Sequence, residues 1–364
     1  MKSAFALVLV IALCLGCSGC AWMDGSYVSI TPHQLGFSQS SEDVPVVSGY
    51  AGLRNMLTAL VDSCDAKGLC YLSGYSQEDA ESDVQAVISY ICRSYPIGAY
   101  AVESIEYAFG VSSGQNALSL DITYRHTRSE IDKIRTVRGI SGAKRAIAEA
   151  LDGCRDSLVL QITGYEETDF VQLIGDYTAG HPDVVMELPQ TSVQVYPEQG
   201  DVRIVELLFA YQTSRDSLRQ MQNQVEPIFS SAKLYVSSDA EARTKFSQLY
   251  TFLMERSDYT IETSITPAYS LLRHGVGDSK AFAQIYAAMC RQVGLECLSV
   301  SGTYNGESRF WNIILENDTY FHVDLLDCAR VGYFRTLTDE QMSGYVWDYS
   351  AYPVCGIPIE NPEE

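Results

Sequence analysis

Hydrophobic positions recur at helical spacing in two stretches of the chain that also resemble each other. Residues 47–75 and 137–165 align without gaps and share Val, Gly, Asp, Cys and Tyr at matching positions. A second match joins 124–134 to 211–221. Similarity at a nearly constant offset indicates one structural unit present twice.

Each copy predicts a helix, a strand, a second helix, two further strands and the start of another helix. We therefore interpret 46–135 and 136–225 as two tandem α+β repeats, because two copies are too few for a solenoid. Their histidines, His126 and His181, have no partner nearby in sequence. The repeats therefore predict binding or spacing and no catalysis.

The pattern changes after residue 225. Residues 240–260 predict a helix, and the apolar spacing after Gly277 predicts another. The segment 295–308 indicates a strand that ends in a turn, and 310–327 indicates a hairpin with Asn317-Asp318 near its turn. We expect a third α+β domain at 226–364, which includes a tyrosine-rich tail.

The order of short motifs in this region resembles that of a transglutaminase-like domain. That family has the papain-like fold and a Cys-His-Asp triad, with the Cys on the first turn of a helix. The resemblance covers roughly 238–330 and rests on Gly294, Val300-Ser301-Gly302, Trp311-Asn312 and His322-Val323-Asp324.

The resemblance implies that Ser279 occupies the position of the nucleophilic Cys, Arg309 that of the His, and Asp324 that of the Asp. A serine hydroxyl needs a general base to take its proton, and an arginine stays protonated in proteins. We therefore expect these triad positions to be inactive. The other residues of the expected cleft are Asp278, Trp311, Asn312 and His322.

Two interpretations of Ser279 follow. Strand alternation places His322 on the same face as Asp324, so His322 is one candidate base for a Ser279 hydrolase. In the other interpretation Ser279 or Asp278 caps the helix, and Arg309 forms an ion pair with Asp324. The second explains both substitutions at once, and we favour it.

The first twenty residues indicate a secreted protein. Lys2 precedes an apolar run that is too short to span a bilayer, and the run ends in Cys17-Ser18-Gly19-Cys20. This ending resembles a bacterial lipobox, with Cys20 as the lipidated residue and Cys17 as a poorer alternative. We expect a signal peptide at 1–20, a linker at 21–45, and an extracytoplasmic protein held at the cell membrane through lipidated Cys20.

The net charge of −21 argues against nucleic acid as a partner. One island differs: between Arg125 and Arg155 lie eight Lys or Arg and four acidic residues. It reads as a solvated helix face, or as a patch that faces anionic lipid or wall polymer.

Eight cysteines follow the lipobox, and their even number permits disulfides outside the cell. We predict a pair between Cys328 and Cys355. No metal or nucleotide motif occurs in the chain after the signal, so we predict no metal and no cofactor. The aromatic residues of the tail either line a groove or pack onto their own domain: Tyr333, Tyr345, Trp347, Tyr349 and Tyr352.

Together these features predict a cell-surface lipoprotein with a degenerate transglutaminase-like domain. Its function would be non-enzymatic binding of peptide, protein or cell-wall material through the former substrate cleft. A peptide or acyl hydrolase that uses Ser279 is the first alternative. A structural spacer is the second.

Overall fold

A computed structural model describes residues 44–260 and 264–359. The fold is α+β, as the sequence predicts. The described chain divides into two compact units, one formed by 44–134 with 196–204 and the other by 135–195 with 205–359. Expected features at 1–43, including Cys17 and Cys20, lie outside the described residues. None of the helices in the described ranges has the length and apolar character needed to cross a membrane.

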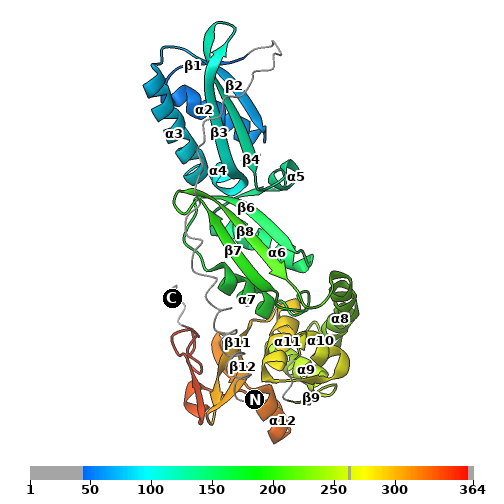
Figure 1. Cartoon of the computed structure of the whole chain (residues 1–364). Helices are drawn as coiled ribbons and strands as arrows, with labels where there is room; N and C mark the ends of the chain where they lie inside the picture. The colour runs from blue at the N-terminus through cyan, green and yellow to red at the C-terminus, as the bar shows by residue number, and fades with distance from the viewer. Residues whose placement is uncertain (1–43, 261–263, 360–364) are drawn as a thin grey trace, which may run out of the picture. The chain divides into compact units, whose positions relative to one another are not determined.

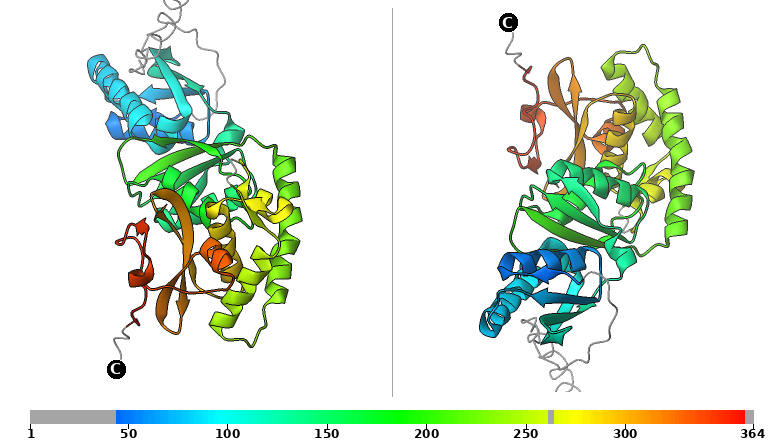
Figure 2. Two further views of the ribbon diagram at one scale, coloured as in Figure 1. Left: turned by 90° about the horizontal axis from the view of Figure 1, so that it is seen from below. Right: turned by 90° about the horizontal axis from the view of Figure 1, so that it is seen from above.

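The first module, residues 46–135, packs helices against a four-stranded sheet with the strand order β1-β2-β4-β3. Leu53, Leu57 and Val61 form the buried face of α2, and α3 lies beside α2 (Figures 1 and 2). The elements are β1 (Val46–Val47), α2 (Gly49–Asp62), β2 (Lys67–Leu72), α3 (Gln77–Arg93), α4 (Pro96–Ala101), β3 (Val102–Ser112), β4 (Gln115–Tyr124) and α5 (Arg128–Ile131).

The second module, residues 136–225, has a four-stranded sheet with the equivalent order β5-β6-β8-β7. Its elements are β5 (Arg135–Arg138), α6 (Gly139–Asp152), β6 (Ser157–Thr163), α7 (Phe170–Gly180), β7 (Gln190–Tyr196), β8 (Val202–Ala210) and α8 (Arg215–Tyr235). The helix and strand order expected for each copy is thus present, and β1, β5 and the short helix α4 are additions that the sequence did not predict.

Positions that match in sequence take the same backbone conformation in the two modules. The first strand pairs in parallel with the second in both, and Val47 faces Leu72 as Val137 faces Ile162. Gly49 and Gly139 both have positive φ, +67° and +57°, and so do Cys64 and Cys154 at +53° and +47°. In each module a left-handed glycine thus turns the chain from the first strand into the first helix.

The C-terminal domain places α11 (Ser279–Gln292) against β11 (Cys297–Tyr304) and β12 (Glu307–Glu316), as Figure 1 shows. Its sheet has the order β13-β12-β11-β14, with β13 at Thr319–Val323 and β14 at Tyr345–Trp347. The remaining elements are α9 (Ala242–Met254), β9 (Asp258–Tyr259), α10 (Pro267–Tyr269), the π-helix η1 (Ser270–His274), β10 (Val276–Gly277), α12 (Leu325–Val331) and the 3₁₀-helix η2 (Asp339–Gln341).

Helix α8 runs without a break through the expected boundary at 225/226. Its first half contributes Leu218 and Val225 to a buried cluster of the second module, and its second half contributes Phe229 and Ala232 to the core of the C-terminal domain. Because one helix supplies both cores, the second module and the C-terminal domain belong to the same compact unit.

The predicted Cys328–Cys355 disulfide is wrong. Both residues are buried free thiols. The other described cysteines are also free, and each of them is buried or half-buried. The Cys328 thiol lies against the backbone of Arg335, whereas Cys355 lies against Pro353 and Asp339. The chain folds the tail onto a different face of the sheet from α12, so the two thiols sit in separate clusters.

The tyrosine-rich tail packs partly onto its own domain. Tyr345 and Trp347 are buried with Trp311 in a second core on the sheet. Tyr333 and Tyr349 remain exposed. The self-packing interpretation therefore holds for the residues of β14 and not for the whole tail.

Candidate functional site

The start of α11 is held by Asp278 rather than by Ser279. The Asp278 carboxylate accepts a hydrogen bond from the backbone N–H of Ala281 at 2.8 Å, which is the usual role of an N-cap aspartate. Ser279 is the first residue of the helix and is buried, with 7% of its surface exposed. Of the two capping residues considered from the sequence, Asp278 is the cap.

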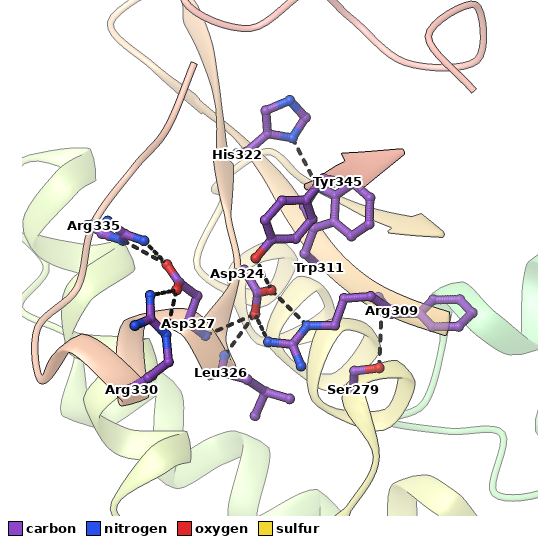
Figure 3. Close-up of polar contacts among 11 residues, drawn as sticks. Ser279, Arg309, Trp311, His322, Asp324, Leu326, Asp327, Arg330, Arg335 and Tyr345 are labelled. Carbon is purple, nitrogen blue, oxygen red and sulfur yellow. Dashed lines mark hydrogen bonds and ion pairs between the residues drawn. The ribbon is translucent and has the colours of Figure 1, made fainter. Parts of the chain in front are cut away.

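The hydroxyl of Ser279 is directed at strand β12. Its Oγ accepts a hydrogen bond of 3.2 Å from the backbone N–H of Phe310, the residue after Arg309 (Figure 3). No histidine or carboxylate of the described residues makes a hydrogen bond to this hydroxyl. The contact thus joins the helix to the sheet, and it does not activate the oxygen.

Arg309 and Asp324 form a bidentate ion pair at the centre of the site. Nε and one terminal nitrogen of Arg309 each donate to a different oxygen of Asp324, both at 2.8 Å. Only 17% of the Arg309 side chain and 1% of the Asp324 side chain are exposed. The sequence-based prediction of this pair is confirmed by the geometry.

Asp324 also accepts three hydrogen bonds from other residues. Its oxygens receive the backbone N–H groups of Leu326 and Asp327, so Asp324 caps α12, and they receive the hydroxyl of Tyr345 at 2.7 Å (Figure 3). The carboxylate therefore has five donors, which is a complete set for a buried charge.

The two partners of Asp324 keep their protons. Burial alone would lower the pKa of Arg309, but the hydrogen bonds and charge of Asp324 outweigh it and raise the pKa. Burial, followed by the charge of Asp324, raises the pKa of Tyr345. Arg309 therefore remains a cation and Tyr345 a neutral donor, and neither can accept the proton of a nucleophile.

His322 is not brought to Ser279. Strand β13 ends at Val323, and Asp324 keeps an extended backbone (φ −98°, ψ 109°), so the alternation that places His322 and Asp324 on one face holds. His322 nevertheless makes its hydrogen bonds to Trp311 and Asp339 and not to Ser279. His322 is fully buried next to Trp311 and Trp347, on the side of the Arg309–Asp324 pair away from Ser279 (Figure 3). His322 therefore makes no hydrogen bond to Ser279, and the hydrogen bonds of these two residues do not support the interpretation in which His322 is the base for Ser279.

The hydrogen bonds of His322 determine its tautomer. The indole N–H of Trp311 donates to Nδ1 at 3.0 Å, so Nδ1 carries no proton. Nε2 therefore carries it and donates to Asp339 at 2.8 Å. Burial lowers the pKa of His322, although Asp339 opposes that effect, so the ring is neutral.

His322, Asp339 and Cys355 have ligand atoms within 4.8 Å of one another, which is a spacing that a metal ion could use. A metal on Nε2 would move the imidazole proton to Nδ1, where it would meet the N–H of Trp311. Two donors would then face each other in a buried site. The trio therefore does not fit a metal centre, and its hydrogen bonds fasten the tail to β13.

Asn312 connects the helix to the sheet. Its side-chain N–H₂ donates to the carbonyl oxygens of Ala283 on α11 and Leu298 on β11, at 2.9 and 3.3 Å. Together with Ser279, it fixes the position of α11 over β12. The contacts of Asn312 are therefore structural.

A recess of about 530 Å³ lies beside the ion pair. Arg309, Tyr345 and Asp327 are among its lining residues, and Asp327 binds both Arg330 and Arg335. Its full lining is Met254, Ser257, Asp258, Tyr259, Tyr304, Arg309, Leu326, Asp327, Ala329, Arg330 and Tyr345. Asp327, Arg330 and Arg335 were not predicted as site residues from the sequence, although the spacing of Asp327 and Arg330 on a helix is a recognisable signal.

Comparison with known proteins identifies the class of this domain. Residues 231–348 match the transglutaminase-like superfamily, and the C-terminal domain is therefore a transglutaminase-like domain. This match contains the segment 238–330 that carries the sequence motifs.

Two solved structures are similar to the chain. One, described as a TGase, is 10% identical over 46% of this chain and 50% of its own, with a TM-score of 0.26. The other, a cysteine protease candidate from Cytophaga hutchinsonii, is 11% identical over 43% of this chain and 70% of its own, with a TM-score of 0.25. The chain thus spans about half the length of the first. No curated protein matches the sequence.

Proposed function

We propose that this chain is a surface lipoprotein whose transglutaminase-like domain binds a peptide, protein or cell-wall ligand without acyl-transfer chemistry. The observation that supports this most strongly is the bidentate pair between Arg309 and Asp324. It occupies the positions at which the family resemblance expects His and Asp, and Arg309, at the position of the His, cannot accept a proton.

The polar environment of Ser279 agrees with a non-catalytic domain. A serine nucleophile needs a base within hydrogen-bonding distance and donors that stabilise the oxyanion. The described partner of Ser279 Oγ is the N–H of Phe310, which is a donor. A hydrolase that uses Ser279 is the alternative, and it would require a base that comes from outside the described contacts.

The recess beside Arg309 is the proposed ligand site. Its volume of about 530 Å³ lies within the usual range for small-molecule sites and for one or two residues of a peptide. Its lining combines tyrosine rings with both signs of charge, from Asp258 and Arg330 among others. Rings that provide contact area and charges that provide orientation suit a peptide with ionised groups.

Tyr259 and Tyr333 give a matched pair of variants for testing this site. Tyr259 lines the recess and is 49% exposed, whereas Tyr333 is 60% exposed and lies outside the lining. We expect soluble disaccharide-peptide fragments of peptidoglycan to bind in a calorimetric titration. Tyr259→Ala should weaken that binding at least about tenfold, as loss of an aromatic anchor does, and Tyr333→Ala should not.

Equal binding by both variants would place the ligand elsewhere, and no binding by the unchanged protein would rule out this ligand class. If the domain is only a structural spacer, the unchanged protein should not bind these fragments.

The lipoprotein part of the proposal is tested separately. We expect cells that express the full chain to incorporate a labelled fatty acid into the protein. The incorporation should be lost in Cys20→Ser and kept in Cys17→Ser. Loss of incorporation in Cys17→Ser alone would identify Cys17 as the lipidated residue. Incorporation that survives in both variants would contradict a lipid anchor at either residue.

A further inference from the structure

A second recess lies in the second module, at the junction of β5 and α6. It has a volume of about 360 Å³ and a mainly polar wall formed by Arg135, Thr136, Val137, Arg138, Gly142, Arg145 and Glu149. Three arginines therefore face one small space in a protein whose net charge is −21. The recess lies inside the basic island that the sequence contains between residues 125 and 155.

Only one of the three arginines is neutralised within the protein. Arg135 binds both carboxylate oxygens of Glu149. The hydrogen bond and the charge of Arg135 lower the pKa of Glu149, to which Arg155 and Arg145 add, so Glu149 is a carboxylate at neutral pH. Arg138 and Arg145 are exposed and have no hydrogen bond or ion pair with any described residue. The recess consequently carries two positive charges without counter-charges.

The backbone of the module brings these side chains together. Strand β5 pairs with β6, and Gly139, at a φ of +57°, turns the chain directly into α6. A Cβ on Gly142 would lie 3.1 Å from Val137 Cβ, so the glycine allows the helix to lie close against the strand. Arg138 precedes the turn and Arg145 lies on the second turn of the helix, and both line the same recess.

The first module has the same backbone arrangement without the arginines. It keeps the strand register and the left-handed glycine, Gly49. At the positions that correspond to Arg135, Arg138, Arg145 and Glu149 it has Pro45, Ser48, Asn55 and Ala59. The fold thus forms with neutral residues at all four places.

We infer that this recess binds a phosphate monoester. The guanidinium group matches phosphate oxygens with paired N–H donors. A monoester carries a charge of about −1.5 to −2 at neutral pH, which balances the two uncompensated arginines, whereas a single carboxylate would not. The volume leaves room for the phosphate and a small group attached to it. This inference is independent of the ligand proposed for the C-terminal domain.

The test exchanges the arginines for the residues of the first module. The chain from residue 21 onward is titrated with glycerol 3-phosphate by calorimetry, with glycerol and acetate as the uncharged and singly charged controls. A second arm measures sedimentation with phosphatidylcholine vesicles with and without phosphatidic acid, because a lipid headgroup carries the same monoester. The variant is Arg138→Ser with Arg145→Asn, and its matched control removes two exposed charges on α8, Arg219→Asn with Lys233→Ser.

We expect the first variant to weaken binding at least about tenfold and the α8 control to leave it unchanged. Binding of glycerol 3-phosphate would identify a soluble ester as the ligand, and binding only to phosphatidic acid vesicles would identify a membrane lipid. The inference is overturned if neither arm shows binding, if acetate binds as tightly as the phosphate ester, or if Arg138→Ser with Arg145→Asn binds as tightly as the unchanged protein. Unfolding curves of both double variants show that each remains folded.

Discussion

The arginine at the centre of the transglutaminase-like domain and the arginines of the second module have opposite environments. Arg309 is largely buried, and its Nε and one terminal nitrogen both donate to Asp324, which has three further donors. Arg138 and Arg145 are exposed, and no described residue neutralises them. A charged side chain that is paired within the fold contributes to stability, whereas a charged side chain without an ion-pair partner is available to bind a ligand. The two regions therefore predict different responses to mutation.

The largest expected effect comes from removing Asp324. Asp324→Ala leaves Arg309 as a buried charge without a partner, removes the cap of α12 and deprives Tyr345 of its acceptor. We expect a loss of about 3–5 kcal/mol in the free energy of unfolding, measured by urea denaturation. Arg309→Met should cost less, because Asp324 keeps three donors. A loss below about 1 kcal/mol for Asp324→Ala would show that the pair is not a structural centre.

A smaller effect is expected where the tail closes over the site. A Cβ on Gly302 would meet the carbonyl oxygen of Val346 and would lie 2.7 Å from the indole ring of Trp311. Gly302→Ala should therefore displace β14 and cost about 1–3 kcal/mol in the same measurement. Ser301→Ala changes the neighbouring exposed side chain and should have little effect. Equal stability of the two variants would mean that the tail does not pack as described.

Acid should weaken the ion pairs next to the recess. Burial alone would raise the pKa of Asp327, but the hydrogen bonds from Arg330 and Arg335 outweigh it and lower the pKa. Because the folded pKa lies below the unfolded value of about 4, the stabilisation is complete above that value and is lost as the pH falls through the folded pKa.

Unfolding midpoints of the wild type should therefore decline more steeply below about pH 4 than those of Asp327→Asn. Parallel pH profiles would contradict the role of Asp327.

The smallest effect on stability is expected in the second module. Arg138→Ser with Arg145→Asn should change the free energy of unfolding by less than about 0.5 kcal/mol, because the replaced side chains are exposed and unpaired. The same denaturation experiment measures it beside Asp324→Ala. A large loss would mean that the arginines have structural partners, and the comparison between the two regions would fail.

Local patterns predicted much of the C-terminal domain. The spacing of apolar residues predicted α11, and the turn residues Asn317 and Asp318 predicted the hairpin of β12 and β13, where both have positive φ. The pair of Arg309 and Asp324 followed from the motif order and from the chemistry of opposite charges.

Contacts between distant segments could not be predicted in this way. Strands β1 and β5 contain two and four residues, which is too short for a periodic signal. The partner of His322 is Asp339, seventeen residues later in an irregular tail, and the tail path also separates Cys328 from Cys355. Each of these depends on how the tail folds onto the sheet, and no local pattern specifies that path.

The central claim is that the transglutaminase-like domain has no activated nucleophile at Ser279. Labelling of the purified protein with a fluorophosphonate serine probe tests this directly, with Ser279→Ala beside the wild type and a known serine hydrolase as the positive control. The ion pair between Arg309 and Asp324 predicts no labelling of the wild type above the level of Ser279→Ala. Labelling of the wild type that disappears in Ser279→Ala would show that Ser279 is a working nucleophile and would contradict the account.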